Sequence, residues 1–200
     1  MRIVLASASP RRKALLAALG IEFDVIPSDA EETFAGAPSE MVVGNARAKR
    51  DDVAGRVDGG ALVIAADTLV FLDEHVLGKP RDLEEAAAMV ARLSGRTHQV
   101  HTGLAIVDTA SGRAVEGYES TDVTFRNLAP REIDRFVQAV RPVDRAGAYT
   151  VDGPGSLIVE RYDGCYQNVL GLPIVRLDKL LRELDLSLFE LMHPHRSIFL

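Results

Sequence analysis

Residues 2–20, RIVLASASPRRKALLAALG, predict a strand, a loop and a helix in succession. The apolar run of residues 2–6 has strand length and ends at a polar Ser-Ala-Ser cluster. Ser9 followed by Pro10 is an N-cap with proline at the first helical position, and leucines at helical spacing continue until Gly20. The stretch therefore predicts an α/β protein that opens on a buried strand.

Strand and helix signals alternate along the rest of the chain, which indicates the α/β class. The predicted strands are residues 2–6, 22–27, 61–66, 97–108, 114–125 and 156–162, with a hairpin at 69–77 and a glycine-rich loop at 147–155. The predicted helices are residues 10–19, 38–55, 83–95, 130–140 and 173–184, with Asp82 as the N-cap of the third. The two long strands around Ser111-Gly112-Arg113 read as an antiparallel pair, so we expect a mixed twisted sheet with flanking helices.

The length and composition indicate a chain that is able to bury its own hydrophobic core. Of the 200 residues, 47% are hydrophobic and 26% are charged, and Cys165 is the single cysteine. A lone thiol supports neither an internal disulfide nor a cysteine zinc cage, and it favours a reducing compartment. Because Pro10 interrupts any apolar leader and no long apolar run follows, we expect a cytoplasmic protein that enters no membrane. A net charge of −6 and an absence of tryptophan disfavour nucleic-acid binding.

Common nucleotide-binding and hydrolase motifs are absent from the sequence. It contains no GxxxxGK[ST], no GxGxxG after a strand and no GxSxG. His98 and His101 suggest zinc, but they are three apart on a predicted strand and would point to opposite faces, which favours structural or surface roles. His193 and His195, which flank Pro194, are interpreted as solvated loop residues.

A basic run begins the first helix. Arg11, Arg12 and Lys13 follow the hydroxyl groups of Ser7 and Ser9. Backbone N–H groups at a helix N-terminus favour anions, and guanidinium groups bind phosphate oxygens in pairs. Cations at this end are unfavourable by ~0.3–1 kcal/mol each, so the run predicts an anionic partner such as phosphate. The alternative is a solvated basic first turn.

Two carboxylates are candidate ligands for a divalent metal ion. Asp67 follows the predicted strand 61–66, and the crevices of α/β sheets open beyond the carboxyl ends of strands. Glu32 lies in an acidic segment, and Mg²⁺ takes such oxygens alongside substrate phosphates. Lys49 and Lys79 add cations to the set. In the alternative interpretation, Asp67 caps a turn and both lysines are solvated surface groups.

Eight segments together resemble the Maf family in the same order along the chain. They are LASASPRR (5–12), DAEET (29–33), ARAK (46–49), AADT (65–68), GKP (78–80), LSG with HxVxTG (93–103), RAGAY (145–149) and NVLGLP (168–173), and the match spans residues 2–184. The resemblance implies a nucleoside triphosphate pyrophosphatase with two lobes around a cleft, like the inosine triphosphatases. It also implies Mg²⁺ as cofactor, with Mn²⁺ or Co²⁺ as alternatives, a homodimer, and a link to restraint of septum formation.

The resemblance assigns a role to each matching residue. The family's catalytic aspartate falls on Asp67, which would orient or deprotonate a water, and Glu32 joins it as a metal ligand. The phosphate-binding cations fall on Arg11, Arg12, Lys49 and Lys79, and Ser7 also matches.

Three positions tune base choice in the subgroup that prefers dTTP and UTP. Arg11 and Thr68 match that subgroup, but Asp152 stands where it has glutamine. Glutamine offers a donor and an acceptor, whereas an ionised aspartate offers acceptors only. We therefore expect a shifted or broadened base preference, with Thr150 in place of a glycine changing the loop as well. In the alternative interpretation, Asp152 only caps the turn at Gly153.

The chain end and the function both leave alternatives open. We expect one domain over residues 1–184 and an apolar extension over 185–200, including Phe189, Leu191, Ile198 and Phe199, which docks on the body or buries in a partner subunit. Two other functions compete with a pyrimidine-nucleotide pyrophosphatase. One is a house-cleaning pyrophosphatase for modified or purine nucleotides, and the other is a nucleotide-binding regulator of septum formation with little turnover.

Overall fold

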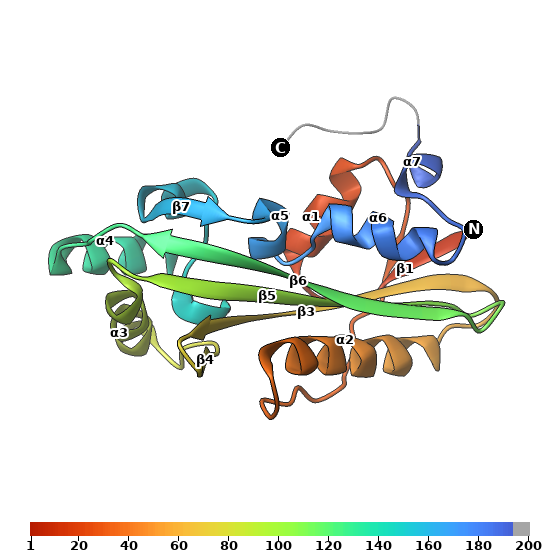
Figure 1. Ribbon diagram of the computed structural model, residues 1–200, viewed down its shortest axis with the longest axis horizontal. Coiled ribbons are helices and arrows are strands. Elements are labelled where there is room, and N and C mark those ends of the chain that lie inside the picture. The colour runs from red at the N-terminus through yellow and green to blue at the C-terminus, as the bar shows by residue number, and fades with distance from the viewer. Residues whose placement is uncertain (194–200) are drawn as a thin grey trace. The chain divides into compact units, whose positions relative to one another are not determined.

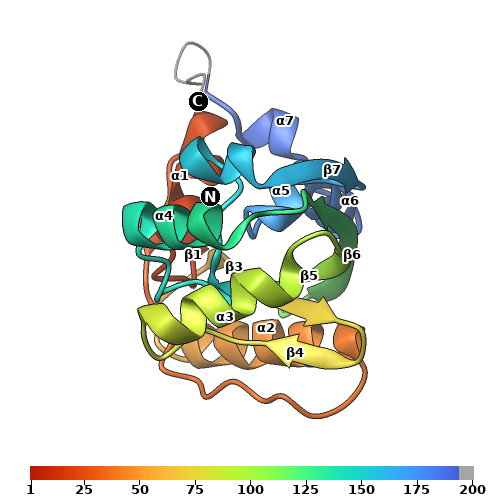
Figure 2. The same ribbon diagram turned by 90° about the vertical axis from the view of Figure 1, so that its left-hand side faces the viewer.

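The computed structural model of the chain describes residues 1–193 (Figures 1 and 2). Its strands are β1 (Arg2–Leu5), β2 (Asp24–Val25), β3 (Ala61–Leu72), β4 (His75–Leu77), β5 (Thr97–Asp108), β6 (Ala114–Phe125) and β7 (Val159–Asp163). Its helices are α1 (Pro10–Ala18), α2 (Pro38–Ala54), α3 (Leu83–Leu93), α4 (Pro130–Val140), α5 (Tyr166–Val169), α6 (Ile174–Arg182) and α7 (Leu188–Leu191), with 3₁₀ helices η1 (Ala146–Ala148) and η2 (Gly153–Leu157).

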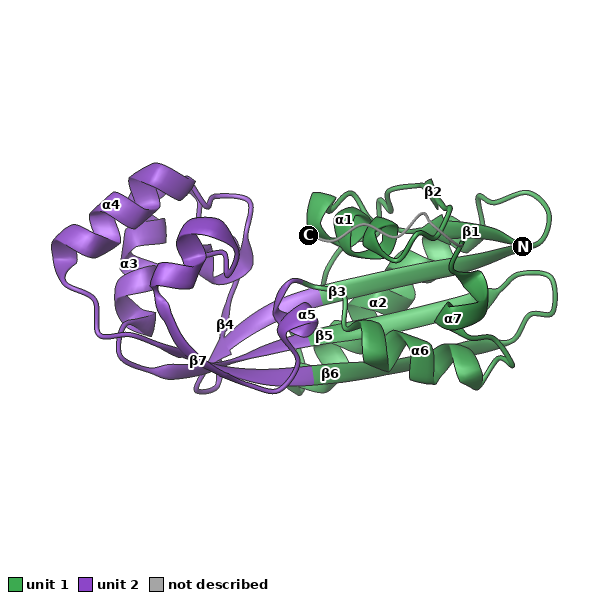
Figure 3. Cartoon of the chain, turned by 90° about the horizontal axis from the view of Figure 1, so that it is seen from above, with its two compact units in different colours: residues 1–67, 102–119, 171–200 green, residues 68–101, 120–170 purple. Residues whose placement is uncertain are grey.

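The chain forms two compact units, coloured separately in Figure 3. Unit 1 consists of residues 1–67, 102–119 and the described part of 171–200, and unit 2 consists of residues 68–101 and 120–170. In unit 1, β1 pairs in parallel with both β2 and β3. In unit 2, β4 pairs with β3 and β7 with β6, both antiparallel. The predicted α/β class with a mixed sheet is therefore confirmed.

Helices cover both faces of the strands in unit 1. Helix α2 lies on one face, and α1 and α6 lie on the other (Figures 1 and 2). Gly103 of β5 permits the close approach of α2, because a Cβ at this position would overlap the backbone of Val42. The aliphatic core beside it consists of Val4, Ala6, Val53, Ala61, Val63 and Ala65. This packing fixes α2 against the strands, and α2 carries two of the polar side chains described below.

Unit 2 has a separate core in which aromatic rings meet edge to face. His98 packs against Phe125 and Tyr149 with ring centroids 4.9 and 5.3 Å apart, and its Nε2 lies 2.8 Å from the Tyr149 hydroxyl. Helices α3 and α4 pack on each other over this core. His98 is therefore a structural residue in the interior of unit 2.

Local capping signals place several elements where the sequence predicts them. Ser9 caps α1, Asp82 caps α3 by accepting the Glu85 N–H at 2.8 Å, and Gly55 is the C-cap of α2. The hairpin strands β5 and β6 have the predicted bounds, and the Arg113 carbonyl accepts the Asp108 N–H at 3.0 Å in the turn between them.

The prediction that Asp67 lies at the carboxyl end of a strand is wrong. Strand β3 runs through Asp67 to Leu72, so Asp67 sits in its middle. An acid normally ends an apolar strand because an unpaired buried charge is costly. Here the charge is paired with a lysine, and Leu69 and Phe71 continue the buried run.

Two other predicted strands are shorter than expected. Residues 22–27 form a strand only at Asp24–Val25, where two register pairs with β1 are made at the sheet edge. The strand predicted from residue 156 begins at Val159, because η2 occupies Gly153–Leu157. Helices α5 and α7 are each four residues long and carry no separate signal in the sequence pattern.

The start of the apolar extension packs on unit 1. Leu188 of α7 is buried, and its N–H donates to Asp178 Oδ1 at 2.8 Å. Phe189 is 76% exposed, and Ile198 and Phe199 lie outside the described residues, as does His195. Within residues 1–193, we find no helix with the length and apolar character that a membrane span requires.

Candidate active site

The candidate site in unit 1 is centred on Asp67 of β3. This residue is 3% exposed, and each of its carboxylate oxygens accepts one hydrogen bond. Lys49 Nζ donates to Oδ1 at 2.6 Å, and Asn45 Nδ2 donates to Oδ2 at 3.0 Å. Asn45 and Lys49 are four residues apart on α2, so they project from the same face of that helix.

Lys49 joins Asp67 to the second carboxylate, Glu32. Its Nζ lies 2.6 Å from Glu32 Oε1 and 2.6 Å from Asp67 Oδ1, and the lysine side chain is only 14% exposed. The two acids therefore converge on one cationic nitrogen. Because the nitrogen is largely shielded from water, the pair with Asp67 is screened less than a surface ion pair.

Arg12, from the basic run at the start of α1, lies in the same unit. Its Nε donates to the Gly171 carbonyl at 2.8 Å, and its Nη1 donates to Ser7 Oγ at 3.2 Å. Burial lowers the pKa of Arg12, while the charges of Asp67 and Glu32 raise it and that of Arg11 lowers it. Arg12 is thus within electrostatic reach of both acids and of Arg11.

This arrangement can hold an anion next to two acids. Arg11 and Arg12 lie in the first turn of α1, whose backbone N–H groups favour negative charge. Ser7 is buried, and its Oγ also accepts the Ser9 N–H at 3.2 Å, which orders the turn before the helix. The structure therefore brings together Ser7, Arg11, Arg12, Lys49, Glu32 and Asp67 in one unit.

The other predicted site residues belong to unit 2. Lys79 is exposed in the turn after β4, and Thr68 is partly buried in β3. The Gly147 N–H donates to the Gly78 carbonyl at 3.0 Å, which joins the GKP and RAGAY segments within this unit. Lys79 is therefore presented from a turn that is tied to the glycine-rich loop.

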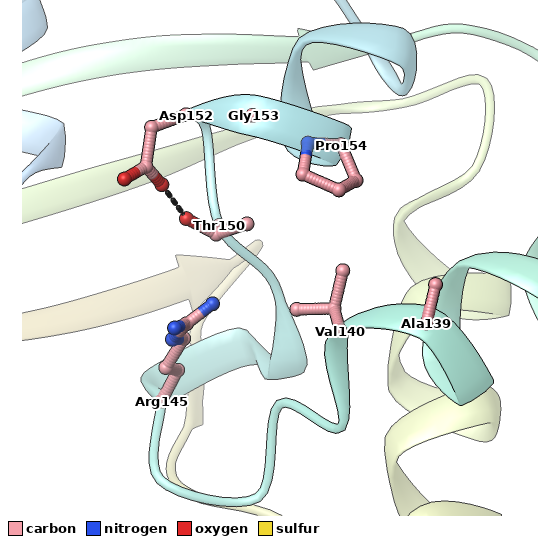
Figure 4. A pocket seen from close by; sticks show the side chains of 7 residues that line it. All are labelled: Ala139, Val140, Arg145, Thr150, Asp152, Gly153 and Pro154. Atoms are coloured by element: carbon pink, nitrogen blue, oxygen red, sulfur yellow. Dashed lines mark hydrogen bonds between the residues drawn. The ribbon is translucent and has the colours of Figure 1, made fainter.

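Asp152 lines a pocket of ≈ 260 Å³ in unit 2 with Arg145 and Thr150 (Figure 4). The Thr150 hydroxyl donates to Asp152 Oδ1, as the dashed line in Figure 4 marks. Asp152 is the N-cap residue of η2 but makes no side-chain cap hydrogen bond there. The Asp152 side chain therefore does not cap the turn at Gly153 in η2, as the alternative interpretation expected.

Comparison with known proteins gives the family. The family described as Maf-like protein matches residues 2–184. The chain belongs to this family. Its relatives include the dTTP/UTP pyrophosphatase of Caldicellulosiruptor bescii, 43% identical over 194 residues that cover 94% of this chain and 98% of the relative. Another is the dTTP/UTP pyrophosphatase of Bacillus cereus, 42% identical over 188 residues that cover 93% and 97%.

Solved structures give more distant matches. The nucleoside-triphosphatase / dITP/XTP pyrophosphatase of Mycobacterium abscessus is 20% identical with a TM-score of 0.45, and it covers 64% of this chain and 76% of its own. A HAM1 protein of Coxiella burnetii is 19% identical with a TM-score of 0.45, over 64% and 74% of the two chains.

Sequence reasoning about this Maf-like chain missed Asn45 and Gly171. Asn45 sits among the buried residues of α2, between Met41 and Lys49 at helical spacing. A polar residue on an apolar helix face is a signal that could have singled it out. Gly171 contributes only its carbonyl, which no side-chain pattern reports.

The two histidines that suggested zinc are both buried, and each contacts different residues. His98 bonds Tyr149, whereas His101 Nε2 lies 3.3 Å from Gln99 Oε1 and 3.2 Å from Ser120 Oγ. Burial lowers the pKa of both, that of His98 to about 4. In residues 1–193, no group of three or more His, Cys, Asp or Glu side chains is placed to hold a metal ion.

Proposed function

We propose that this Maf-like protein hydrolyses a nucleoside triphosphate to its monophosphate and pyrophosphate, with dTTP or UTP as substrate. Relatives that share 42–45% of their residues over nearly their whole length bear the name dTTP/UTP pyrophosphatase. The observation that carries the proposal is the convergence of Asp67 and Glu32 on the Lys49 nitrogen, with Arg12 in electrostatic reach. The cations suit the negative charges of a triphosphate and its leaving group, and the acids suit a divalent ion or an attacking water.

The cations of unit 1 are proposed to hold the phosphates. Arg11 and Arg12 would bind phosphate oxygens with the first turn of α1, and Ser7 would hold Arg12 in place or bind an oxygen itself. Lys49 would turn from the two acids to the phosphates when substrate arrives. Lys79, Thr68 and Asp152 are proposed as substrate-binding residues on their motif positions alone.

Glu32 and Asp67 are the residues that would hold a divalent metal ion. They fit, because one oxygen of each already lies 2.6 Å from a common cationic nitrogen. Mg²⁺ typically takes one or two carboxylates together with substrate phosphates, and Mn²⁺ or Co²⁺ would use the same oxygens. When bound, the ion would neutralise charge on the phosphate oxygens.

Asp67 is proposed to orient or deprotonate the attacking water. The water oxygen forms a bond to the α-phosphorus, and the bond from that phosphorus to the bridging oxygen of the β-phosphate breaks. The water proton passes to the carboxylate, and pyrophosphate leaves with the bonding electrons. Departure of Lys49 would free Oδ1 of Asp67 for the metal ion, and Oδ2, which has a second lone pair besides the one that Asn45 occupies, would accept the water proton.

The substitution at position 152 supports a second candidate among the substrates. Asp152 accepts a hydrogen bond from Thr150, so its oxygens are oriented within the pocket of unit 2. An acceptor suits the exocyclic amine of cytosine or guanine better than O4 of thymine or uracil. Cytosine and guanine nucleotides are therefore the alternative substrates, and a preference for guanine or for modified bases would make the protein a house-cleaning pyrophosphatase.

A substrate panel tests these proposals. Each common nucleoside triphosphate is offered with and without Mg²⁺, Mn²⁺ or Co²⁺, and phosphate is measured after added inorganic pyrophosphatase. We expect metal-dependent release of pyrophosphate and monophosphate from at least one pyrimidine nucleotide. Tight nucleotide binding without turnover would support the septum-regulator alternative instead.

We also propose a homodimer in which residues 185–200 extend the domain of residues 1–184. Phe189 offers an exposed apolar ring at the start of this extension. Truncation after Leu184 followed by sizing chromatography tests its part in assembly. A dimer that survives truncation would assign the extension to packing on its own chain.

A further inference from the structure

The Asn45 side chain makes three hydrogen bonds in the candidate site, and no sequence motif assigns a role to it. It is 1% exposed, and its amide contacts two segments that are distant in sequence. Oδ1 accepts the Thr33 N–H at 2.8 Å, and Nδ2 donates to the Thr33 carbonyl at 3.1 Å. Nδ2 also donates to Asp67 Oδ2 at 3.0 Å.

These three bonds leave one orientation for the amide. The Thr33 N–H requires an acceptor, so the side-chain oxygen must face it. The nitrogen then faces Asp67, and its two protons are both used. An amide flip would set a carbonyl oxygen against a carboxylate oxygen, which is repulsive. Asn45 is therefore a fixed donor to Asp67.

The contacts also connect the two candidate metal ligands. Thr33 directly follows Glu32, so the bonds from Asn45 fix the backbone next to this acid. The same amide group fixes Oδ2 of Asp67. One helical turn later, Lys49 bridges one oxygen of each acid. Helix α2 thus sets the separation of Glu32 and Asp67 through Asn45, whether or not Lys49 stays between them.

We propose that Asn45 is a positioning residue that holds Glu32 and Asp67 in the relative placement needed to bind a divalent cation. The inference rests on the proposed function of this site. Residues behind metal-binding carboxylates orient them, and their loss typically weakens metal affinity or activity by about 10–100-fold. Lys49 is not assigned this role, because in the proposed function the same lysine leaves the two acids for the phosphates.

The experiment compares Asn45→Ala with the matched control Asn168→Ala. Asn168 is a second fully buried asparagine, and its Nδ2 donates to the Val100 carbonyl and to Thr121 Oγ1 within unit 2. Both variants lose buried hydrogen bonds and are expected to melt at lower temperature. Only Asn45→Ala removes a contact to Asp67 and Thr33.

Three measurements on the full-length chain separate positioning from stability. Binding of Mn²⁺ to the nucleotide-free protein is measured by calorimetry, turnover of dTTP gives kcat and KM, and amide hydrogen exchange reports on the Thr33 N–H. In Asn45→Ala, we expect Mn²⁺ affinity and kcat each to fall about 10–100-fold, KM to change less than about threefold, and Thr33 to lose protection. Asn168→Ala should keep the wild-type Mn²⁺ affinity and kcat below its melting temperature.

A folded Asn45→Ala protein with wild-type Mn²⁺ affinity would overturn the proposal, and so would a wild-type protein that binds no Mn²⁺. If Asn45→Ala does not fold, Asn45→Ser at the same position, which removes the donor to Asp67 with less loss of polarity, takes its place in the same measurements. Wild-type protein that binds Mn²⁺ but turns over no nucleotide would refute the proposed function and leave the positioning role supported by the binding data.

Discussion

Lys49 and Asp67 form an ion pair of 2.6 Å in which the acid is the more buried partner, with side chains 14% and 4% exposed. The same lysine nitrogen also contacts Glu32, so one cation is shared by two acids. This sharing explains how β3 keeps an aspartate in the middle of an apolar strand. It also places the acid proposed for catalysis and the lysine proposed for phosphate binding in direct contact before substrate binds.

Replacing Asp67 by asparagine should abolish turnover and keep nucleotide binding. The amide that replaces the carboxylate cannot accept the water proton, and loss of a general base typically costs about 10²–10⁴-fold in rate. Calorimetry with a non-hydrolysable dUTP analogue measures binding, and pyrophosphate release measures kcat. Asp73→Asn is the matched control, because Asp73 is exposed and has a positive φ that asparagine tolerates. Near-normal turnover in Asp67→Asn would refute the catalytic role.

Removing the lysine charge should strengthen metal binding in the absence of nucleotide. In Lys49→Met, Glu32 and Asp67 lose their shared cation and face each other as like charges, which a divalent ion relieves. We expect Mn²⁺ affinity to rise severalfold or more while KM for the nucleotide also rises. The control is Lys13→Met, since Lys13 is exposed on α1. An unchanged Mn²⁺ affinity would mean that Lys49 does not compete with the metal for these acids.

Restoring glutamine at position 152 should move base preference toward dTTP and UTP. The glutamine amide can donate to O4 and accept from N3–H, whereas Asp152 only accepts. A hydrogen bond to a polar group is worth about 1 kcal/mol or more, so the ratio of kcat/KM for dTTP over CTP should rise about tenfold in Asp152→Gln. Asp134→Gln, at an exposed position of α4, provides the control. If this kcat/KM ratio were equal in the two variants, Asp152 would have no role in selecting the base.

Local signals predicted much of the fold because the interactions that set it are local. The Ser9 and Asp82 caps, and the turn from Asp108 to Arg113, each involve residues within five positions of one another. The strand containing Asp67 was misjudged because its length depends on partners from α2. Those partners are 18 and 22 residues away, and no periodicity encodes them.

The charged residues of the candidate site could be predicted from the sequence, but the contacts between them could not. The sequence pointed to Arg12, Lys49, Glu32 and Asp67 by residue type and motif. It did not indicate that Lys49 contacts both acids, nor that the Nε of Arg12 donates to the Gly171 carbonyl. Asn45 could be noticed as a polar residue on the apolar face of a helix, but its partners Thr33 and Asp67 are 12 and 22 residues away and no sequence pattern indicates them.

His98 predicts a specific dependence of stability on pH. Burial lowers the pKa of His98 to about 4, against an ordinary value of 6.5 in the unfolded chain. Between these two values the unfolded chain binds a proton that the folded protein does not, so the free energy of unfolding decreases as the pH falls from 6.5 towards 4. At about 1.4 kcal/mol per pKa unit, the loss from this residue is on the order of 3 kcal/mol, and it is absent above pH 6.5.

The variant His98→Phe isolates this contribution. Phenylalanine keeps the edge contacts with Phe125 and Tyr149 but cannot titrate, and it loses the bond to the Tyr149 hydroxyl. We expect the variant to be less stable than wild type at pH 8 and the difference to shrink or reverse at pH 4.5, as measured by urea unfolding. His75→Gln, at the exposed start of β4, should follow the wild-type curve. Parallel curves for wild type and His98→Phe would show that His98 is protonated as easily in the folded protein as in the unfolded chain.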